Sequence, residues 1–175
     1  MTPPIPYLTT QLETARAILF TGAGFSMAAK NINGELMPSA GRLKEELWKL
    51  CFSDDPVDSN STLQGIYEAA LIRNARETKE LLTTLFSVDG NSLPEWYSHF
   101  FKLPWFKCYT LNIDDLAQRL GNKVWLPRKI EPVSGVRDSV GNTESDKDIL
   151  RIIHLNGTIQ DLPKNVTFST TQYAE

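Results

Sequence analysis

The segment that most constrains the fold is a short apolar run at residues 17–20, which stops at the sequence Thr21-Gly22-Ala23-Gly24. Four consecutive apolar residues are too few for a helix and are typical of a strand buried on both faces of a parallel sheet. Glycines directly after such a strand let the backbone turn tightly, and free amides in the turn and at the start of the next helix bind pyrophosphate. The run therefore predicts a buried strand followed by a turn that either binds a ligand or simply connects the strand to the next helix.

The remaining pattern alternates between helical and extended segments. Apolar residues recur at helical spacing in residues 39–52 and 61–85, with Ser61 or Thr62 as the N-cap of the second helix, and residues 9–17 predict a short first helix. Further strands are expected at residues 107–111, 124–126, 149–155 and 166–169, with an exposed loop at residues 135–148. Strands separated by helices predict an α/β fold, a Rossmann-like parallel sheet with flanking helices.

Composition excludes several classes of protein. The chain has 175 residues, and 18 basic against 21 acidic side chains give a net charge of 18 − 21 = −3. This balance argues against direct binding of nucleic acid, which needs a basic surface. No apolar run approaches the roughly 20 residues of a membrane span, and the first residues lack the pattern of a signal peptide. We therefore expect a single cytoplasmic domain with no membrane contact.

Two polar segments follow predicted strands and are candidates for a site. The first is Thr110-Leu111-Asn112-Ile113-Asp114-Asp115, and the second is His154-Leu155-Asn156-Gly157-Thr158. Ligands of open α/β sheets bind at the carboxyl ends of the strands, where both segments are expected. Asp114 or Asp115 also suits a helix cap, and a histidine at a strand end is often structural. Because His154 and Asn156 are two residues apart, an extended strand would point both into one cleft.

Together these segments resemble the sirtuin (silent information regulator) family, whose motifs read Gly-Ala-Gly-x-Ser and Thr-x-Asn-Ile-Asp. Gly22, Ala23, Gly24 and Ser26 match the first motif, and Thr110, Asn112, Ile113 and Asp114 match the second. Met37-Pro38 resembles part of the family's cofactor loop, although the usual Asp-Phe-Arg is missing. The resemblance covers about residues 15–173, and Tyr173 fits a tyrosine common in the sirtuin-like branch of bacterial defence proteins.

The resemblance implies that NAD is bound and is the substrate. Asn112 would hold the ribose or the attacking water, and a histidine would act as general base, with His154 as our expectation. The cofactor-binding residues that it implies are Gly22, Ala23, Gly24, Ser26, Pro38, Ile113, Asp114, Asn156 and Gly157. The family's Leu-His-Gly aligns on Leu155-Asn156-Gly157, which puts Asn156 in place of the histidine. Either His154 serves from the same face or the site has lost its base.

The cysteines separate the reactions that sirtuin-like proteins catalyse. Deacylase sirtuins carry a zinc module with two Cys-x-x-Cys pairs, but this chain has only Cys51 and Cys108, and no cysteine follows Cys108. No zinc or other metal is expected, and protein deacylation becomes the least favoured reaction. The pattern favours NAD hydrolysis to nicotinamide and ADP-ribose. The alternative is a catalytically silent module that binds NAD or ADP-ribose, or that mediates an interaction.

The resemblance also implies a cellular setting. The branch resembled is the zinc-free, NAD-depleting effector domain of bacterial antiphage systems, which act by abortive infection. Such domains form homo-oligomers or work with a sensor or partner, for example an Argonaute-like protein, a helicase or a C-terminal sensor domain. A complete domain of the family has further strands after Tyr173. We therefore expect residues 1–175 to be the N-terminal part of a longer chain, truncated within its sheet.

Overall fold

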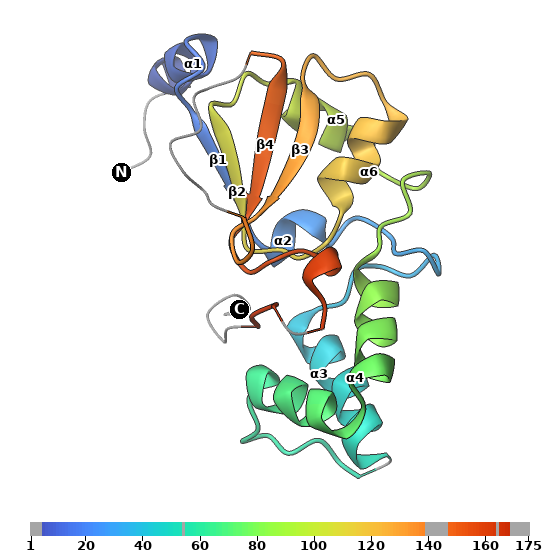
Figure 1. Ribbon diagram of the computed structural model, residues 1–175. Helices are drawn as coiled ribbons and strands as arrows, with labels where there is room; N and C mark the ends of the chain where they lie inside the picture. The colour runs from blue at the N-terminus through green and yellow to red at the C-terminus, as the bar shows by residue number, and fades with distance from the viewer. Residues whose placement is uncertain (1–4, 54, 139–146, 164, 169–175) are drawn as a thin grey trace.

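Four parallel strands form the sheet around which the chain is arranged (Figure 1). They are β1 (Ile18–Thr21), β2 (Lys107–Thr110), β3 (Lys129–Ser134) and β4 (Ile149–His154), hydrogen-bonded in the order β1-β2-β4-β3. The structure is a computed structural model that describes residues 5–53, 55–138, 147–163 and 165–168. Strands that alternate with helices in an all-parallel sheet agree with the predicted α/β, Rossmann-like class.

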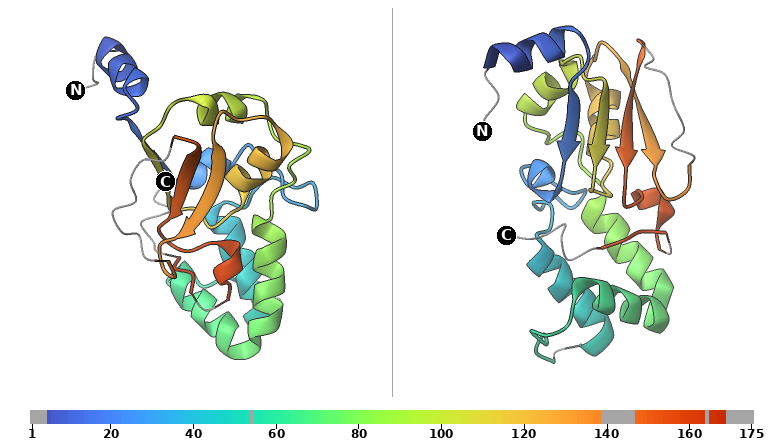
Figure 2. Two further views of the ribbon diagram at one scale, coloured as in Figure 1. Left: turned by 45° about the horizontal axis from the view of Figure 1, so that its top comes forward. Right: turned by 90° about the vertical axis from the view of Figure 1, so that its left-hand side faces the viewer.

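The helices occupy three places around this sheet. Helices α5 (Trp96–Lys102) and α6 (Leu116–Lys123) pack on one face, and the short α2 (Ala23–Ser26) follows β1 at its carboxyl end (Figures 1 and 2). Helices α3 (Ala40–Phe52) and α4 (Leu63–Phe86) pair beyond the carboxyl ends of the strands. Helix α1 (Ile5–Glu13) lies at the opposite end and has no buried residue, and a short 3-10 helix, η1 (Ile159–Asp161), follows β4. No helix in the described ranges has the length and apolar character needed to cross a membrane.

Local sequence signals account for the two long helices. The Ser39 hydroxyl accepts a hydrogen bond from the Arg42 amide at 3.2 Å and caps α3. Thr62, one of the two expected caps, accepts from the Gly65 amide at 3.1 Å and starts α4. Asn74 interrupts α4 with non-helical backbone angles, and its side chain caps the second half of the helix. Each cap satisfies an amide that the helix itself leaves unpaired.

The strand predicted at residues 124–126 is wrong. These residues form an irregular connection after α6, and the strand begins five residues later as β3, paired only with β4. Pro132 lies inside β3, where it removes one backbone donor, which is tolerated because β3 is an edge strand. Proline and alternating charges at an edge leave little apolar signal, so sequence reasoning placed the strand on the more apolar segment before it.

The prediction that β1 is buried on both faces is also wrong. It is the other edge strand, and Ile18 and Phe20 remain 54% and 59% exposed. The apolar run correctly indicated a strand, but composition does not reveal how many neighbours a strand has. The first helix also ends earlier than expected, at Glu13, before a turn in which Ala15 has a positive φ of 50°.

The expected strand at residues 166–169 is an irregular segment over its described part, residues 166–168. Phe168 is 1% exposed and packs edge-on against Tyr67 of α4, with ring centroids 4.8 Å apart. Residues 139–146 of the expected loop, Ser169 and Tyr173 lie outside the described residues. The described ends of that loop, residues 135–138 and 147–148, are exposed as expected.

Truncation of Leu47 tests the packing of α3 against the core. Its side chain is 0% exposed, so Leu47→Ala is expected to lower the free energy of unfolding by about 2–5 kcal/mol, the range for leucine removed from a packed core. Ile72→Ala is the matched control, because Ile72 is 87% exposed, and its effect should stay within about 0.5 kcal/mol. Denaturant unfolding of both variants measures the difference, and equal losses would contradict this core.

Candidate functional site

The glycine turn after β1 and the polar segment after β2 meet through the side chain of Asn112. Its Nδ2 donates to the Gly22 carbonyl at 3.0 Å and to Ser26 Oγ at 2.8 Å. The meeting follows from sheet topology, because β1 and β2 are parallel neighbours with Thr21 opposite Thr110. Two segments nearly ninety residues apart in sequence thus lie at the same carboxyl edge, where α/β proteins bind ligands.

A buried carboxylate holds this junction together. Ser26 Oγ donates to Asp114 Oδ2 at 2.7 Å, and the Leu116 amide donates to Asp114 Oδ1 at 3.1 Å. Burial raises the pKa of Asp114, and these two hydrogen bonds, together with the nearby His154, oppose the rise. The sequence allowed Asp114 to be a helix cap, and its carboxylate does accept a hydrogen bond from an amide in the first turn of α6. Asp114 also orients the Ser26 hydroxyl, which accepts a hydrogen bond from Asn112 Nδ2.

His154 lies against the back of the same junction and is 2% exposed. Its Nδ1 is 2.8 Å from the Asn112 carbonyl oxygen, and its Nε2 is 3.4 Å from Nε2 of Gln118. A carbonyl only accepts, so Nδ1 carries the proton and Nε2 of the neutral ring is an acceptor. Both nitrogens are thus engaged within the protein, and the role of His154 as general base stays a prediction.

Asn156 and Gly157 take no part in the hydrogen bonds that join Gly22, Ser26, Asn112 and Asp114. Strand β4 ends at His154, so the two-residue alternation that placed His154 and Asn156 in one cleft does not continue. Asn156 instead donates to the Leu111 carbonyl at 2.9 Å. Gly157 has a φ of +84°, and a Cβ there would come within 2.6 Å of the Asn165 carbonyl oxygen. The backbone alone therefore requires this glycine.

The space around Asn112 is small. A cavity of about 20 Å³, room for one water molecule, is lined by Ala23, Ser26, Met37, Pro38, Phe86, Asn112, Ile113 and Asp114. Six of these eight residues are candidates from the sequence, whereas Met37 and Phe86 add apolar walls. A second cavity of about 20 Å³ shares Ser26, Asn112 and Asp114 and is lined also by Phe25, Phe101 and His154. Neither space admits a dinucleotide in this conformation.

The two glycines of the turn face open space. A Cβ added to Gly22 or Gly24 would meet nothing within 4 Å, and neither residue has a positive φ. Neither packing nor backbone geometry demands glycine here, which leaves room for a ligand to approach the backbone closely. Helix α2 after the turn has only four residues, so its dipole contributes less to anion binding than the sequence suggested.

A larger cleft of about 270 Å³ opens on the other side of Ile113 and Asp114, at the carboxyl ends of β3 and β4. Its lining consists of Ile113, Asp114, Asp115, Gln118, Arg119, Asn122, Pro132, Ser134, Arg137, Thr158, Ile159 and Gln160. Sequence reasoning missed most of this cleft because it misplaced β3. The spacing Thr158-x-x-Asp161 was a readable signal, since it is the pattern of a capping box, which the structure contains.

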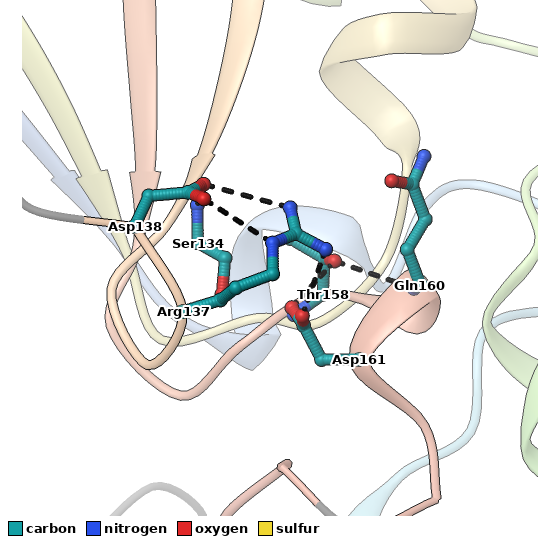
Figure 3. Close-up of polar contacts among 6 residues, drawn as sticks. All are labelled: Ser134, Arg137, Asp138, Thr158, Gln160 and Asp161. Atoms are coloured by element: carbon teal, nitrogen blue, oxygen red, sulfur yellow. Dashed lines mark hydrogen bonds and ion pairs between the residues drawn. The ribbon is translucent and has the colours of Figure 1, made fainter.

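Arg137 lies between two carboxylates beside this cleft (Figure 3). Its guanidinium is 3.1 Å from Asp161 Oδ1 and 3.2 Å from Asp138 Oδ1. Asp161 Oδ2 also accepts from the amide and hydroxyl of Thr158, both at 2.8 Å. Burial alone would raise the pKa of Asp161, but these hydrogen bonds and the nearby Arg137 hold it below its usual value. The carboxylate is therefore charged and paired.

Comparison with known proteins adds no family to this description. No protein-family model matches the chain, and no curated protein matches it. Within the described part of the chain, no group of three or more histidine, cysteine, aspartate or glutamate side chains is placed to hold a metal ion.

The burial of His154 predicts a loss of stability in mild acid. Burial holds its pKa below the usual 6.5, although the hydrogen bond to Asn112 and the charges of Asp114, Asp161 and Asp115 oppose the shift. The unfolded chain therefore takes up the proton first. Stability is fully present above about pH 6.5 and is lost as the pH falls toward the folded-state pKa.

Denaturant unfolding at pH 7.5 and 5.5 measures this effect. The wild type should lose stability between the two, and His154→Gln should lose less. His99→Gln is the control, because His99 is largely exposed and should leave the wild-type dependence unchanged. The raised pKa of Asp114 contributes with the opposite sign in both the wild type and the control. An unchanged pH dependence in His154→Gln would contradict a neutral, buried imidazole.

Proposed function

We propose that this chain binds NAD⁺ between the glycine turn and Asn112 and hydrolyses the bond between nicotinamide and ribose. The observation that carries the proposal is the contact of Asn112 Nδ2 with both the Gly22 carbonyl and Ser26 Oγ. It sets an amide side chain directly on a glycine turn at the carboxyl ends of parallel strands. The open space beside Gly22 and Gly24 supports close approach of a pyrophosphate to the turn.

The chemistry suits the residues at this junction. Nicotinamide is a cation in NAD⁺ and leaves as a neutral molecule, so hydrolysis needs no pair of acid and base carboxylates. It needs a group that stabilises an oxocarbenium-like ribose and one that positions water. In the proposal, Asn112 exchanges its present partners for the ribose or the water. Ile113 and Asp114, which line the small cavity beside it, hold the carboxamide.

Binding requires this junction to open. The cavities that flank Asn112 each have about 20 Å³, far less than a dinucleotide occupies. One wall is formed by Met37, Pro38 and Phe86, which belong to the segment before α3 and to the end of α4. Displacement of this wall is therefore part of the proposed binding step, and the described conformation is the closed one.

A second candidate function is binding without turnover. It is favoured by the engagement of both ring nitrogens of His154 and by the hydrogen bond from Asn156 to the Leu111 carbonyl. In that case neither residue reaches the substrate, and the protein binds NAD⁺ or ADP-ribose as an interaction module. The two functions differ in one measurable property, the release of nicotinamide.

The cellular role in the proposal rests on the resemblance to sirtuin-like defence proteins. There, NAD⁺ depletion would abort phage infection, with this chain as the effector and a sensor or a second copy as the trigger. In this proposal, activity is measured on the full-length protein with its partner present.

Loss of the Asn112 amide should abolish hydrolysis. Nicotinamide release by Asn112→Ala is expected to fall about 100-fold or more, the usual effect of removing one preorganised donor from a reaction site. Asn122→Ala is the matched control, because Asn122 is exposed and outside the junction. Chromatography of nicotinamide and ADP-ribose measures turnover, and calorimetry with NAD⁺ measures binding.

The result separates the two functions and can reject both. Turnover that depends on Asn112 supports hydrolysis, and binding without any product supports the silent module. Undiminished turnover in Asn112→Ala, or no binding of NAD⁺ and ADP-ribose at millimolar concentration, rejects the proposed site.

A further inference from the structure

Asp115 precedes α6 but does not cap it. Among the described amides of this helix, none donates a capping hydrogen bond to its carboxylate. Its Oδ1 instead accepts from the backbone amide of Val88 at 2.8 Å, and its Oδ2 accepts from Nε of Arg119 at 2.7 Å. Hydrogen bonds to a charged carboxylate are the strong ones, and two of them hold this group in one orientation. Asp115 therefore fixes the position of Val88 relative to α6.

Val88 belongs to the wall that closes the small cavity at the candidate site. It lies two residues after Phe86, the wall residue with which α4 ends. Two backbone hydrogen bonds of 2.9 Å join residues 87–89 to residues 30–32, and the two segments lie side by side below α6 (Figure 1). Met37, another residue of the wall, follows the second segment closely in the sequence. The two parts of the wall therefore form one unit.

This unit is continuous with the glycine turn and not with the segment that carries Asn112. The Ala29 amide donates to the Ser26 carbonyl at 2.9 Å, which ties the start of the wall segment to the turn. The hydrogen bonds from Asn112 to the turn cross the division between the two parts. The bond from Val88 to Asp115 crosses it as well. Unlike the others, it involves no residue assigned to NAD⁺.

Burial makes the bond between Val88 and Asp115 an effective restraint. Val88 is 1% exposed and the side chain of Asp115 is 13% exposed, so water competes little for either group. Lys123 of α6 also donates to the side chain of Asn91, in the turn after Val88, but both of these residues are exposed. A hydrogen bond at the surface is readily exchanged for one to water. The Asp115 carboxylate is therefore the stronger of these two attachments.

We propose that Asp115 is a positioning residue that controls access to Asn112, because it holds the wall closed through the amide of Val88. The proposal rests on the proposed binding of NAD⁺ at this junction, which requires the wall to move. A ligand that binds only the open state loses affinity in proportion to the fraction of protein that is closed. The Asp115 carboxylate therefore lowers the affinity for NAD⁺ without touching it.

Hydrogen exchange of the full-length protein measures the opening with no ligand present. In Asp115→Ala, the amides of Ile32 and Asp89 should exchange roughly 10- to 100-fold faster, the effect of one lost charge-assisted hydrogen bond. These two amides are informative because their own partners lie within the wall and are unchanged. Amides of β2 and β4 should keep their wild-type rates. Asp115→Asn retains an acceptor for Val88 and should restore most of the protection.

Lys123→Ala is the matched control. It removes the exposed hydrogen bond between the same helix and the same turn, so exchange at Ile32 and Asp89 should stay within about twofold of the wild type. A general loss of stability gives a different pattern, because it raises exchange in the sheet together with the wall.

Calorimetry with NAD⁺ on the same variants measures access. Asp115→Ala should bind NAD⁺ about fivefold tighter or better, because less of the free protein is closed. Where nicotinamide is released, KM should fall while kcat changes little. Removal of a residue with a merely structural role would weaken binding, so the sign of the change distinguishes the two roles. Lys123→Ala should bind NAD⁺ as the wild type does.

The outcomes separate this proposal from the proposed function. Unchanged exchange at Ile32 and Asp89 in Asp115→Ala, or exchange raised equally in β2 and β4, would overturn the role of Asp115. Selective opening with unchanged or weaker binding of NAD⁺ would overturn its control of access. If no variant binds NAD⁺ and the wall still opens selectively, the proposed function fails and the restraint of the wall by Asp115 is supported.

Discussion

The organisation of the site depends on the two hydrogen bonds made by the hydroxyl of Ser26. It donates to the buried carboxylate of Asp114 and accepts from the amide of Asn112, so it joins the glycine turn after β1 to the polar segment after β2. A hydroxyl has one proton, and here it is committed to Asp114. Asn112 must therefore present its NH₂ to Ser26, which directs the amide onto the Gly22 carbonyl as well. One short side chain thereby fixes the geometry of the whole junction.

The same network explains why the junction is closed. Nδ2 of Asn112, the Ser26 hydroxyl and the Asp114 carboxylate already have partners within the protein, and apolar residues line the small cavities on both sides. Opening must break the contacts of Asn112 and move the wall formed by Met37, Pro38 and Phe86. Because the hydrogen bonds of Asn112 are partly buried, a ligand that bound as proposed would have to replace them with new ones.

Much of the fold could be predicted from the sequence, because local patterns determine it. The apolar stripes and caps predicted α3 and α4, and the apolar runs predicted β2 and β4 within about one residue. Strand order could not be predicted in this way, since it depends on contacts between distant segments. That is why β1 was expected to be buried on both faces, whereas it lies at an edge of the sheet with Ile18 and Phe20 exposed. Strand β3 was missed because Pro132 and its charged neighbours carry no clear apolar signal.

In the candidate site, too, local motifs predicted some features, whereas others depend on contacts between segments that are distant in the sequence. The motifs predicted that Ser26, Asn112 and Asp114 lie together, and parallel pairing of β1 and β2 is sufficient to bring them there. The state of His154 was not predictable, because its burial arises from α6 and from the partner that Gln118 provides. A neutral imidazole with its proton on Nδ1 donates to the Asn112 carbonyl, and its Nε2 faces the NH₂ group of Gln118. The Gln118 oxygen is then the acceptor that this chain of contacts leaves without a partner among the described residues.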